Sequence, residues 1–372
     1  MKTKQCTLMA LAALLFAACG NQNEPPVPAE KTAKLEITLA GTPAAVKPEG
    51  AAMAAVRSTG DAILTEEEVK IERVAVGVFN SDNKVNVIRE FTTEEVTAKK
   101  ANVLCSPATG ASVIVVANAP SGHFAGVTTK AAFTAKTVDL SATVTGTSQL
   151  GNKLPMSGEN TGVNLTGGNT VTSTVTISRL VGRVSIGSIQ TAFDQNGQYK
   201  AATFKLSKIF LHNANITSTV APGAPVGTSP QSGQTDDTYA YLRNDIAPVQ
   251  SITGTPYTTL YWFYTFANDG SSAPTRLVLY GDFDPDGTTG SAPAVPVYYP
   301  ITINKTQTGT IIAGGTGTAT GEVKANATYT LTATIKGKGS SGPDVELIPA
   351  TLDLTVSVAT WALNITQDVT FN

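Results

Sequence analysis

The sequence predicts an all-β protein with two β-sandwich domains in tandem. Short segments with alternating apolar residues recur along the chain and are separated by turn-rich loops, which is the pattern of a β-sandwich. The composition agrees, because 33 Gly, 20 Pro and abundant Thr and Val favour strands and turns. A length of 372 residues suggests about two domains once a leader is removed.

The first 19 residues have the layout of an export signal. Two lysines precede an apolar run over residues 7–18, which is shorter than the about 20 residues that a membrane span needs. Small residues come directly before Cys19 in the segment LFAACG, and this segment is similar to a bacterial lipobox, whose cysteine is acylated. We therefore expect residues 1–19 to be a lipoprotein signal peptide with lipid on Cys19. Plain signal-peptide cleavage is the alternative.

Charge and cysteine content restrict the partners and the compartment. A net charge of −2 gives no electrostatic case for nucleic acid or for an anionic membrane surface. Cys6 and Cys19 lie in the leader, so Cys105 is the one cysteine of the remaining sequence and has no intrachain disulfide partner. Stability must then come from core burial. We expect the surface of a Gram-negative bacterium as the compartment.

The segment after the leader contains a lone strand pattern. A Pro-rich tether precedes residues 34–40, in which Leu35, Ile37 and Leu39 point one way and polar residues the other, as in a half-buried strand. Residues 41–60 are rich in Ala, Gly and Pro and have no strand pattern. This run, which contains Arg57, is the best candidate in the chain for a protease-accessible segment.

The first domain is predicted over residues 58–178. One stretch, residues 126–138, is modestly helical, and residues 158–168 are predicted to form an Asn/Gly-rich loop. The phase of the apolar alternation changes near residues 178–182, which places the domain boundary there. The predicted strands of this domain cover residues 69–79, 85–89, 111–118, 154–158 and 171–177.

The second domain is predicted over residues 179–372 and ends in an unusual pattern. A long Pro/Gly/Ser loop covers residues 221–236. Predicted strands cover residues 183–189, 203–211, 258–266, 275–283, 295–303, 328–336 and 352–358. Alternation then continues to the last residue, because the apolar side chains of residues 362–372 occupy odd positions. These side chains are Leu363, Ile365, Val369 and Phe371.

The sequence gives only weak signals for metal, sugar or catalytic sites. Residues 282–287 have the spacing of the first half of a calcium loop, but Pro293 stands where such a loop needs a bidentate Glu, so a hairpin turn is the better interpretation. The aromatic residues between 257 and 266 alternate as core packing does, although a sugar-stacking platform is the alternative. His123 and His212 belong to no metal or nucleophile motif. We expect no catalytic, metal or cofactor site, and no enzyme activity.

Several short segments together resemble one family in their order along the chain. They are Arg57 in its small-residue run and residues 105–107, 113–118, 179–184, 298–300 and 358–361. With the lipoprotein leader, this order resembles the Bacteroidales type V pilins, the FimA-type fimbrillins. The resemblance implies two transthyretin-like β-sandwich domains, export to the outer membrane as a lipoprotein, and incorporation into a cell-surface fimbrium that supports adhesion and biofilm formation.

The resemblance also implies a maturation route. An Arg-specific surface protease cuts between Arg57 and Ser58, which removes a propeptide over residues 20–57 and leaves 372 − 57 = 315 residues. The strand of Leu35, Ile37 and Leu39 is then the removable one. The strand of Leu363, Ile365, Val369 and Phe371 is donated to a neighbouring subunit, so the chain itself is the main partner.

Other partners and roles remain open from the sequence. The resemblance adds accessory fimbrial subunits and host or bacterial surface ligands to the partners. Within the family, an anchor subunit that keeps its lipid and a tip subunit are alternatives to a shaft subunit. From a different class, a surface glycan-binding lipoprotein of a nutrient-uptake system is the alternative, with the aromatic segment 257–266 as its platform.

Overall fold

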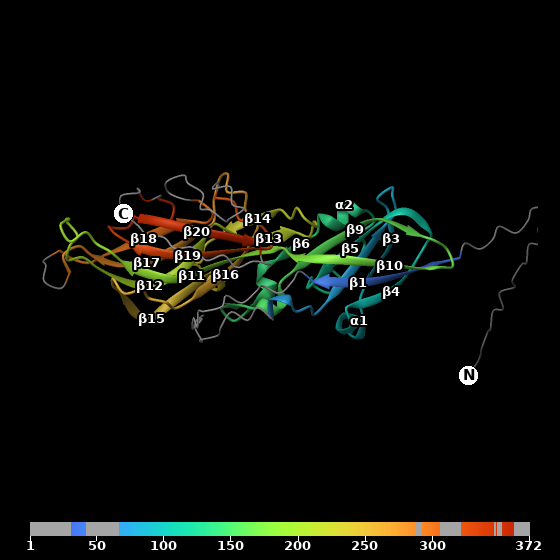
Figure 1. The fold of residues 1–372 in the computed structure, drawn as a ribbon, viewed down its shortest axis with the longest axis horizontal. Helices are drawn as coiled ribbons and strands as arrows, with labels where there is room; N and C mark the ends of the chain where they lie inside the picture. The colour runs from blue at the N-terminus through green and yellow to red at the C-terminus, as the bar shows by residue number, and fades with distance from the viewer. Residues whose placement is uncertain are drawn as a thin grey trace, which may run out of the picture.

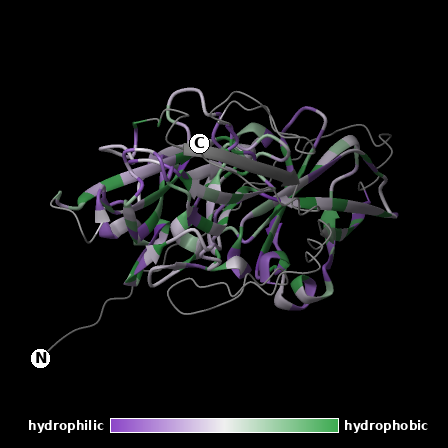
Figure 2. Cartoon of the chain, turned by 60° about the vertical axis from the view of Figure 1, so that its left-hand side comes forward, coloured by the Kyte–Doolittle hydropathy of each residue, from purple (hydrophilic) through white to green (hydrophobic). Residues whose placement is uncertain are grey.

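A computed structural model describes residues 31–41, 67–287, 292–305, 321–345, 347 and 352–360. The strands form two halves that lie end to end along the long axis of the molecule, with β1–β10 in one half and β11–β20 in the other (Figure 1). Hydrophobic and hydrophilic residues interleave along the strands, as two-layered β structure requires (Figure 2). The predicted all-β class with tandem β-sandwiches is confirmed.

One seven-stranded sheet dominates the first half, with the strand order β3-β2-β5-β9-β10-β1-β4. Its strands are β1 (Ala33–Gly41), β2 (Val74–Phe79), β3 (Val85–Glu90), β4 (Lys100–Cys105), β5 (Ala108–Ala117), β9 (Met156–Leu165) and β10 (Thr170–Arg179). Apolar side chains of six of these strands, β3 excepted, form one fully buried cluster, which contains the inward residues of β1. The sheet therefore curves around its own core.

Two facing four-stranded sheets build the second half, with the orders β16-β11-β19-β20 and β15-β12-β17-β18. The first consists of β11 (Val181–Thr191), β16 (Tyr261–Phe266), β19 (Ala327–Ile335) and β20 (Leu352–Thr360). The second consists of β12 (Thr203–His212), β15 (Arg243–Ile252), β17 (Arg276–Asp284) and β18 (Val295–Thr302). Buried side chains from both sheets meet in one apolar cluster, which makes this half a sandwich.

The same apolar cluster continues into the first half. It includes Phe79, Ile114 and Phe133, which lie on the face of the first sheet opposite to the β1 core. A small sheet with the order β14-β13-β6 also crosses the predicted boundary, because β6 (Thr137–Asp139) pairs with β13 (Ala214–Thr219). The two halves thus share apolar and backbone contacts, while the boundary near residues 178–182 stays a prediction.

Short elements complete the described chain. The helices are α1 (Thr93–Ala98), α2 (Lys130–Thr134), η1 (Glu67–Val69), η2 (Leu140–Thr143), η3 (Gly151–Lys153) and η4 (Asp237–Leu242). The remaining strands are β7 (Val144–Thr145), β8 (Ser148–Gln149) and β14 (Gly227–Gln231).

Some predicted elements differ from the observed ones. The Asn/Gly-rich loop over residues 158–168 is wrong, because β9 continues to Leu165 and pairs with β5. The strand predicted from residue 69 starts at Val74, because η1 comes first. The predicted 13-residue helical stretch is reduced to α2. Strands β4, β13 and β15 and helix α1 are absent from the prediction, although a capping box of Thr92 and Glu95 marks the start of α1. The predicted loop over residues 221–236 is wrong in part, because β14 lies within it and pairs with β13.

A buried ion pair lies at the junction of the two halves. Glu68 in η1 is 1% exposed, and its carboxylate accepts hydrogen bonds from Arg183 Nη1 at 2.9 and 3.0 Å and from Tyr264 Oη at 2.8 Å. Its backbone carbonyl accepts a bond from Arg179 Nε at 2.9 Å. Burial lowers the pKa of Arg179 to about 10, so its guanidinium stays charged at neutral pH. Glu68 thereby ties η1 to β10, β11 and β16.

We expect Glu68→Ala to lower the free energy of unfolding by about 3–5 kcal/mol, because the buried guanidinium of Arg183 loses its carboxylate partner. Glu67→Ala is the matched control, since the Glu67 side chain is 41% exposed and its one described ion pair, with Lys70 Nζ, is long at 3.7 Å. The control should cost about 0–1 kcal/mol. Urea unfolding of the intact chain measures both, and equal losses would contradict a special role for the buried pair.

Candidate functional site

The predicted lone strand is present as β1, which occupies a slot between two strands that are distant in sequence (Figure 1). On one side β1 runs parallel to β10, from Lys34 opposite Thr170 to Gly41 opposite Ile177. On the other side it runs antiparallel to β4, from Ala33 opposite Cys105 to Thr38 opposite Lys100. Both backbone edges of β1 are therefore paired.

Three apolar side chains fill the inward side of the slot. Leu35 and Ile37 are 0% exposed and Leu39 is 6% exposed, which agrees with the alternation in the sequence. Ile37 stands in register between Ser173 and Ala101, and these small neighbours leave room for a branched side chain. We call this slot, with β10 and β4 as its walls, the β1 groove.

The outward side of β1 contributes less to the binding of the strand. Its one described ion pair joins Glu36 Oε1 to Lys100 Nζ at 3.0 Å, with the side chains 27% and 47% exposed. Partly exposed pairs of this kind contribute about 0–1 kcal/mol. Burial of a Leu or Ile side chain contributes about 1.5–3 kcal/mol, so the inward face dominates.

A glycine pair closes the backbone around the start of β1. A Cβ atom at Gly167 would lie 2.5 Å from the carbonyl oxygen of Lys31, so only glycine permits this approach. Gly168 has a φ of +80° and donates its N–H to the Thr32 carbonyl at 3.0 Å. This turn fixes the point at which the chain enters the β1 groove.

Each wall depends strongly on β1 for its backbone pairing. Among the described strands, β4 has a ladder with β1 and with no other strand. The other ladder of β10 pairs it with β9 only at Ser178 and Arg179. Removal of β1 would therefore uncover backbone groups on both walls and an apolar strip between them, and such an edge is a template for another strand.

Cys105 lies in this groove as a buried core residue, opposite Ala33 of β1. It is 2% exposed, and burial raises the pKa of its thiol to about 11. A thiol with a raised pKa is unreactive at neutral pH, which excludes it as a nucleophile in this state.

Most other predicted site residues lie outside the described residues. They are Cys19, Arg57, Ser58, Leu363, Ile365, Val369 and Phe371. The described part of the chain ends at Thr360 with β20, the edge strand of its sheet. The lipid, the cleavage point and the donor strand therefore stay predictions, while Leu35, Ile37 and Leu39 are described.

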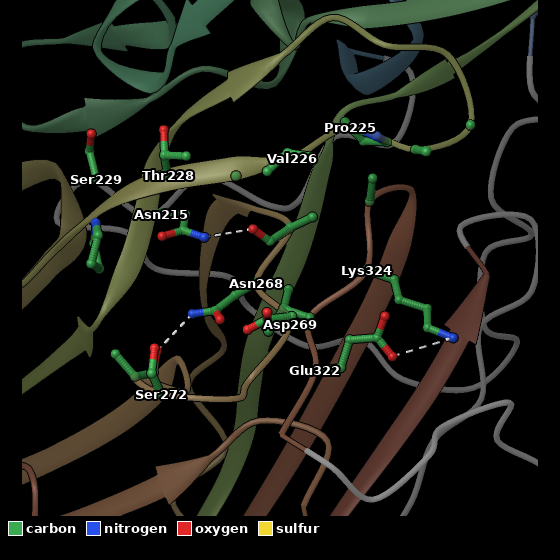
Figure 3. Close-up of a pocket in the computed structure, with 18 residues that line it drawn as sticks. Asn215, Pro225, Val226, Thr228, Ser229, Asn268, Asp269, Ser272, Glu322 and Lys324 are labelled. Carbon is green, nitrogen blue, oxygen red and sulfur yellow. Dashed lines mark hydrogen bonds and ion pairs between the residues drawn. The ribbon is translucent and has the colours of Figure 1, made fainter.

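A pocket of about 820 Å³ lies in the second half, among segments 223–230, 267–273 and 322–325 (Figure 3). Several of its polar side chains already interact with other protein groups, and no aromatic ring is among its lining residues. Asn215 bonds to the Ala267 carbonyl at 2.7 Å, Asn268 bonds to the Ala273 carbonyl at 2.9 Å, and Glu322 forms an ion pair with Lys324 at 3.6 Å. The pocket lacks the stacking surface of a sugar site.

The other sequence candidates are structural. All six residues of β16 are buried, as predicted for core packing, so they form no exposed platform. The side chain of Asp284 accepts from the N–H of Gly287 at 2.9 Å in a turn between the paired strands β17 and β18. In the described ranges no group of three His, Cys, Asp or Glu could hold a metal ion, and no helix is long and apolar enough to span a membrane.

The sequence matches the family model of the major fimbrial subunit protein (FimA) over residues 33–207, a span that includes both walls of the β1 groove and β1 itself. This part of the chain is similar to the FimA family. This match confirms the predicted resemblance to the fimbrillins. No curated protein matches the sequence significantly.

Solved structures share the fold over nearly the whole chain. A fimbrilin from Porphyromonas gingivalis W83 matches with a TM-score of 0.62 and 17% identity, covering 91% of this chain and 99% of that one. A protein assigned to cell adhesion from Parabacteroides distasonis ATCC 8503 matches with a TM-score of 0.64, 16% identity and coverages of 91% and 99%. Another protein assigned to cell adhesion, from Bacteroides eggerthii DSM 20697, has a TM-score of 0.62, 21% identity and coverages of 90% and 97%.

The fimbrillin family is one of structural proteins and not of enzymes, which confirms the prediction of no enzyme activity. The match to this family supports a fimbrial structural or adhesive role at the cell surface. The matched family also points to self-polymerisation and to accessory fimbrial subunits as partners. The β1 groove is the feature of this chain that can be tested for such assembly.

We expect Ile37→Ala to lower the free energy of unfolding of the intact chain by about 2–5 kcal/mol, because it leaves a cavity in a fully buried site. Glu36→Ala, on the outward side of the same strand, is the control and should cost about 1 kcal/mol or less. Urea titration of both variants gives the comparison. Similar midpoints for the two variants would contradict the dominance of the inward face.

Proposed function

We propose that this chain is the shaft subunit of a cell-surface fimbria, exported as a lipoprotein through Cys19 and matured by cleavage after Arg57. Cleavage separates β1 from the remainder of the chain, and the vacated β1 groove receives the C-terminal strand of a neighbouring subunit. Repetition of this head-to-tail contact does not close on itself and so builds a filament. The surface protease that cleaves after arginine is the second partner of the precursor.

The observation that carries this proposal is the placement of β1. It is paired on both edges and buried on one face, yet residues 42–66 separate it in sequence from the next described element, η1. Arg57 falls within that separating segment, so one cut there would leave β1 with no covalent link to β2–β20. η1 is fixed by the buried pair of Glu68, which supports retention of the downstream chain.

Cleavage changes the competition for the groove. Before the cut, β1 is tethered and rebinds at an effective concentration on the order of millimolar, which excludes an incoming strand. After the cut, β1 leaves by dilution. Its replacement adds main-chain hydrogen bonds to both walls by β-augmentation.

The C-terminal strand has the side chains that such a groove needs. Leu363, Ile365, Val369 and Phe371 could together contribute about 6–12 kcal/mol as an upper estimate, against about 4.5–9 kcal/mol for the three inward residues of β1. Exchange is then favourable once the tether is cut. The strand follows directly after β20, which lies at a sheet edge in the half opposite to the groove (Figure 1).

The alternatives have less support. A glycan-binding lipoprotein would need exposed aromatic side chains, whereas β16 is buried and the pocket has no ring in its lining. An anchor subunit would keep β1 and its lipid, and a tip subunit would not donate its C-terminal strand. N-terminal sequencing of the cell-surface form separates these roles: a start at Ser58 supports the shaft, and a blocked Cys19 supports the anchor or the binding lipoprotein.

We expect Arg57→Ala to abolish polymer formation while export of the precursor continues, because β1 stays tethered. Lys47→Ala is the matched control in the same segment and should polymerise normally, since Pro48 hinders cleavage after Lys47. Electron microscopy and gel ladders of surface extracts give the measurement. Polymers made of full-length Arg57→Ala precursor would refute the cleavage step.

Deletion of residues 362–372 should yield cleaved but monomeric subunits, because the acceptor groove remains and the donor strand is gone. Size-exclusion chromatography after treatment with an Arg-specific protease gives the mass. As a control, Gln367→Ala changes the one polar odd-numbered residue of the strand and should leave polymerisation intact. Normal filaments from the truncated chain would remove the donor assignment.

A further inference from the structure

The two end strands of the first sheet meet without a backbone ladder. β3 and β4 are the outermost strands in the order β3-β2-β5-β9-β10-β1-β4, and no described ladder joins them. Hydrogen bonds between them nevertheless exist, and they come from two side chains of β3, Asn86 and Arg89. This seam closes the sheet around the core that holds β1.

Asn86 bonds to Ser106, the residue directly after β4, through both polar atoms of its amide. Its Nδ2 donates to the Ser106 carbonyl at 2.9 Å, and its Oδ1 accepts from the Ser106 N–H at 2.9 Å. A further bond from Nδ2 to Asn80 Oδ1 at 2.8 Å orients the amide. The side chain thus reproduces the pair of bonds that a neighbouring strand would make with one residue.

Arg89 bonds to the middle of β4. Its Nη2 donates to the Asn102 carbonyl at 2.8 Å, while Nη1 and Nη2 form a fork on the Glu95 carboxylate at 2.8 and 2.7 Å. The guanidinium also lies 5.5 Å from the ring centroid of Phe91. Hydrogen bonding to Arg89 lowers the pKa of Glu95 to about 2, so the pair is fully ionised at neutral pH. The arginine is held from three sides.

These contacts gain importance if β1 leaves, a step that rests on the proposed function. With β1 removed, β4 keeps no ladder with any described strand. Arg89 still bonds to Asn102 in β4, and Asn86 bonds to Ser106, the residue that follows β4. Its inward residues Ala101, Val103 and Cys105 would face a half-empty core. Without a tie to β3, the β4 wall would be free to collapse toward β10.

We propose that Asn86 and Arg89 form a clasp that positions β4 for strand exchange, so that the β1 groove keeps its width for the incoming strand of a second copy. The clasp acts on the wall and not on the incoming strand. Asn86 and Arg89 are therefore positioning residues. Their contribution should be small while β1 is in place and large after it leaves.

The test uses the intact chain with Cys6→Ala and Cys19→Ala, so that Cys105 is the single thiol. A fluorescent peptide with the sequence of residues 31–41 is added during cleavage by an Arg-specific protease, and its capture by the vacated groove is titrated. Hydrogen exchange of the β4 amides is followed before and after cleavage. Labelling of Cys105 by a thiol reagent reports an open groove in the same sample.

Arg89→Gln should weaken peptide capture about tenfold, since it removes a charge-assisted hydrogen bond to β4 and the ion pair that orients it. Asn86→Ala should act in the same direction. Arg89→Lys should recover part of the loss, because lysine keeps the charge but not the fork. Before cleavage, β4 exchange in these variants should remain close to wild type.

Arg243→Gln is the matched control, because Arg243, like Arg89, bonds to both carboxylate and backbone carbonyl groups but lies in β15 of the other half. It should capture the peptide as wild type does. If Arg89→Gln and Asn86→Ala capture as tightly as Arg243→Gln, the clasp is overturned. The clasp is also overturned if they lose β4 protection equally before and after cleavage. If wild type itself neither exposes Cys105 nor captures peptide, the proposed function fails and the clasp with it.

Discussion

Backbone pairing of one strand on both of its edges organises the first half of this protein. β1 is the only ladder partner of β4 among the described strands and the main partner of β10, so two distant segments of the chain depend on it. Unpaired N–H and C=O groups beside an apolar strip are costly to leave uncovered. A strand in the groove covers these groups, and any strand with suitable alternation of apolar side chains could do so.

Side chains complete the structure where ladders are missing. The Asn86 amide and the Arg89 guanidinium bond to the backbone of β4 across the seam of the first sheet. At the junction of the halves, Glu68 joins η1 to arginines of β10 and β11. Asn86 and Arg89 hold the strand next to β1 in place. Glu68 holds η1, the first described element after the segment that connects β1 to the remaining chain. If β1 leaves as proposed, ties of this kind would help the remaining fold to persist.

The family match and the β1 groove together indicate how subunits would assemble. Residues 33–207, which match the FimA family, contain β1 and both of its walls, so the acceptor side of the proposed exchange lies within the matched region. The proposed donor strand lies at the other end of the chain. A filament built by such a contact depends on the difference in binding between a tethered strand of three large apolar residues and an untethered strand of four.

Local patterns in the sequence determined many of the strands, including the one of Leu35, Ile37 and Leu39, because side-chain direction in a strand alternates with a period of two. They also indicated the family through the order of short segments. They did not predict β4, whose buried residues are Ala101, Val103 and Cys105, and they misplaced a loop over β9, where Asn and Gly residues suggested a turn. Only the tertiary structure decided that β1 fits between β10 and β4. It also decided that Asn86 and Arg89 bond across the seam of the first sheet and that Glu68 bonds at the junction of the two halves. Such pairings join residues far apart in sequence, and period and propensity carry no information about which distant backbone a strand will meet.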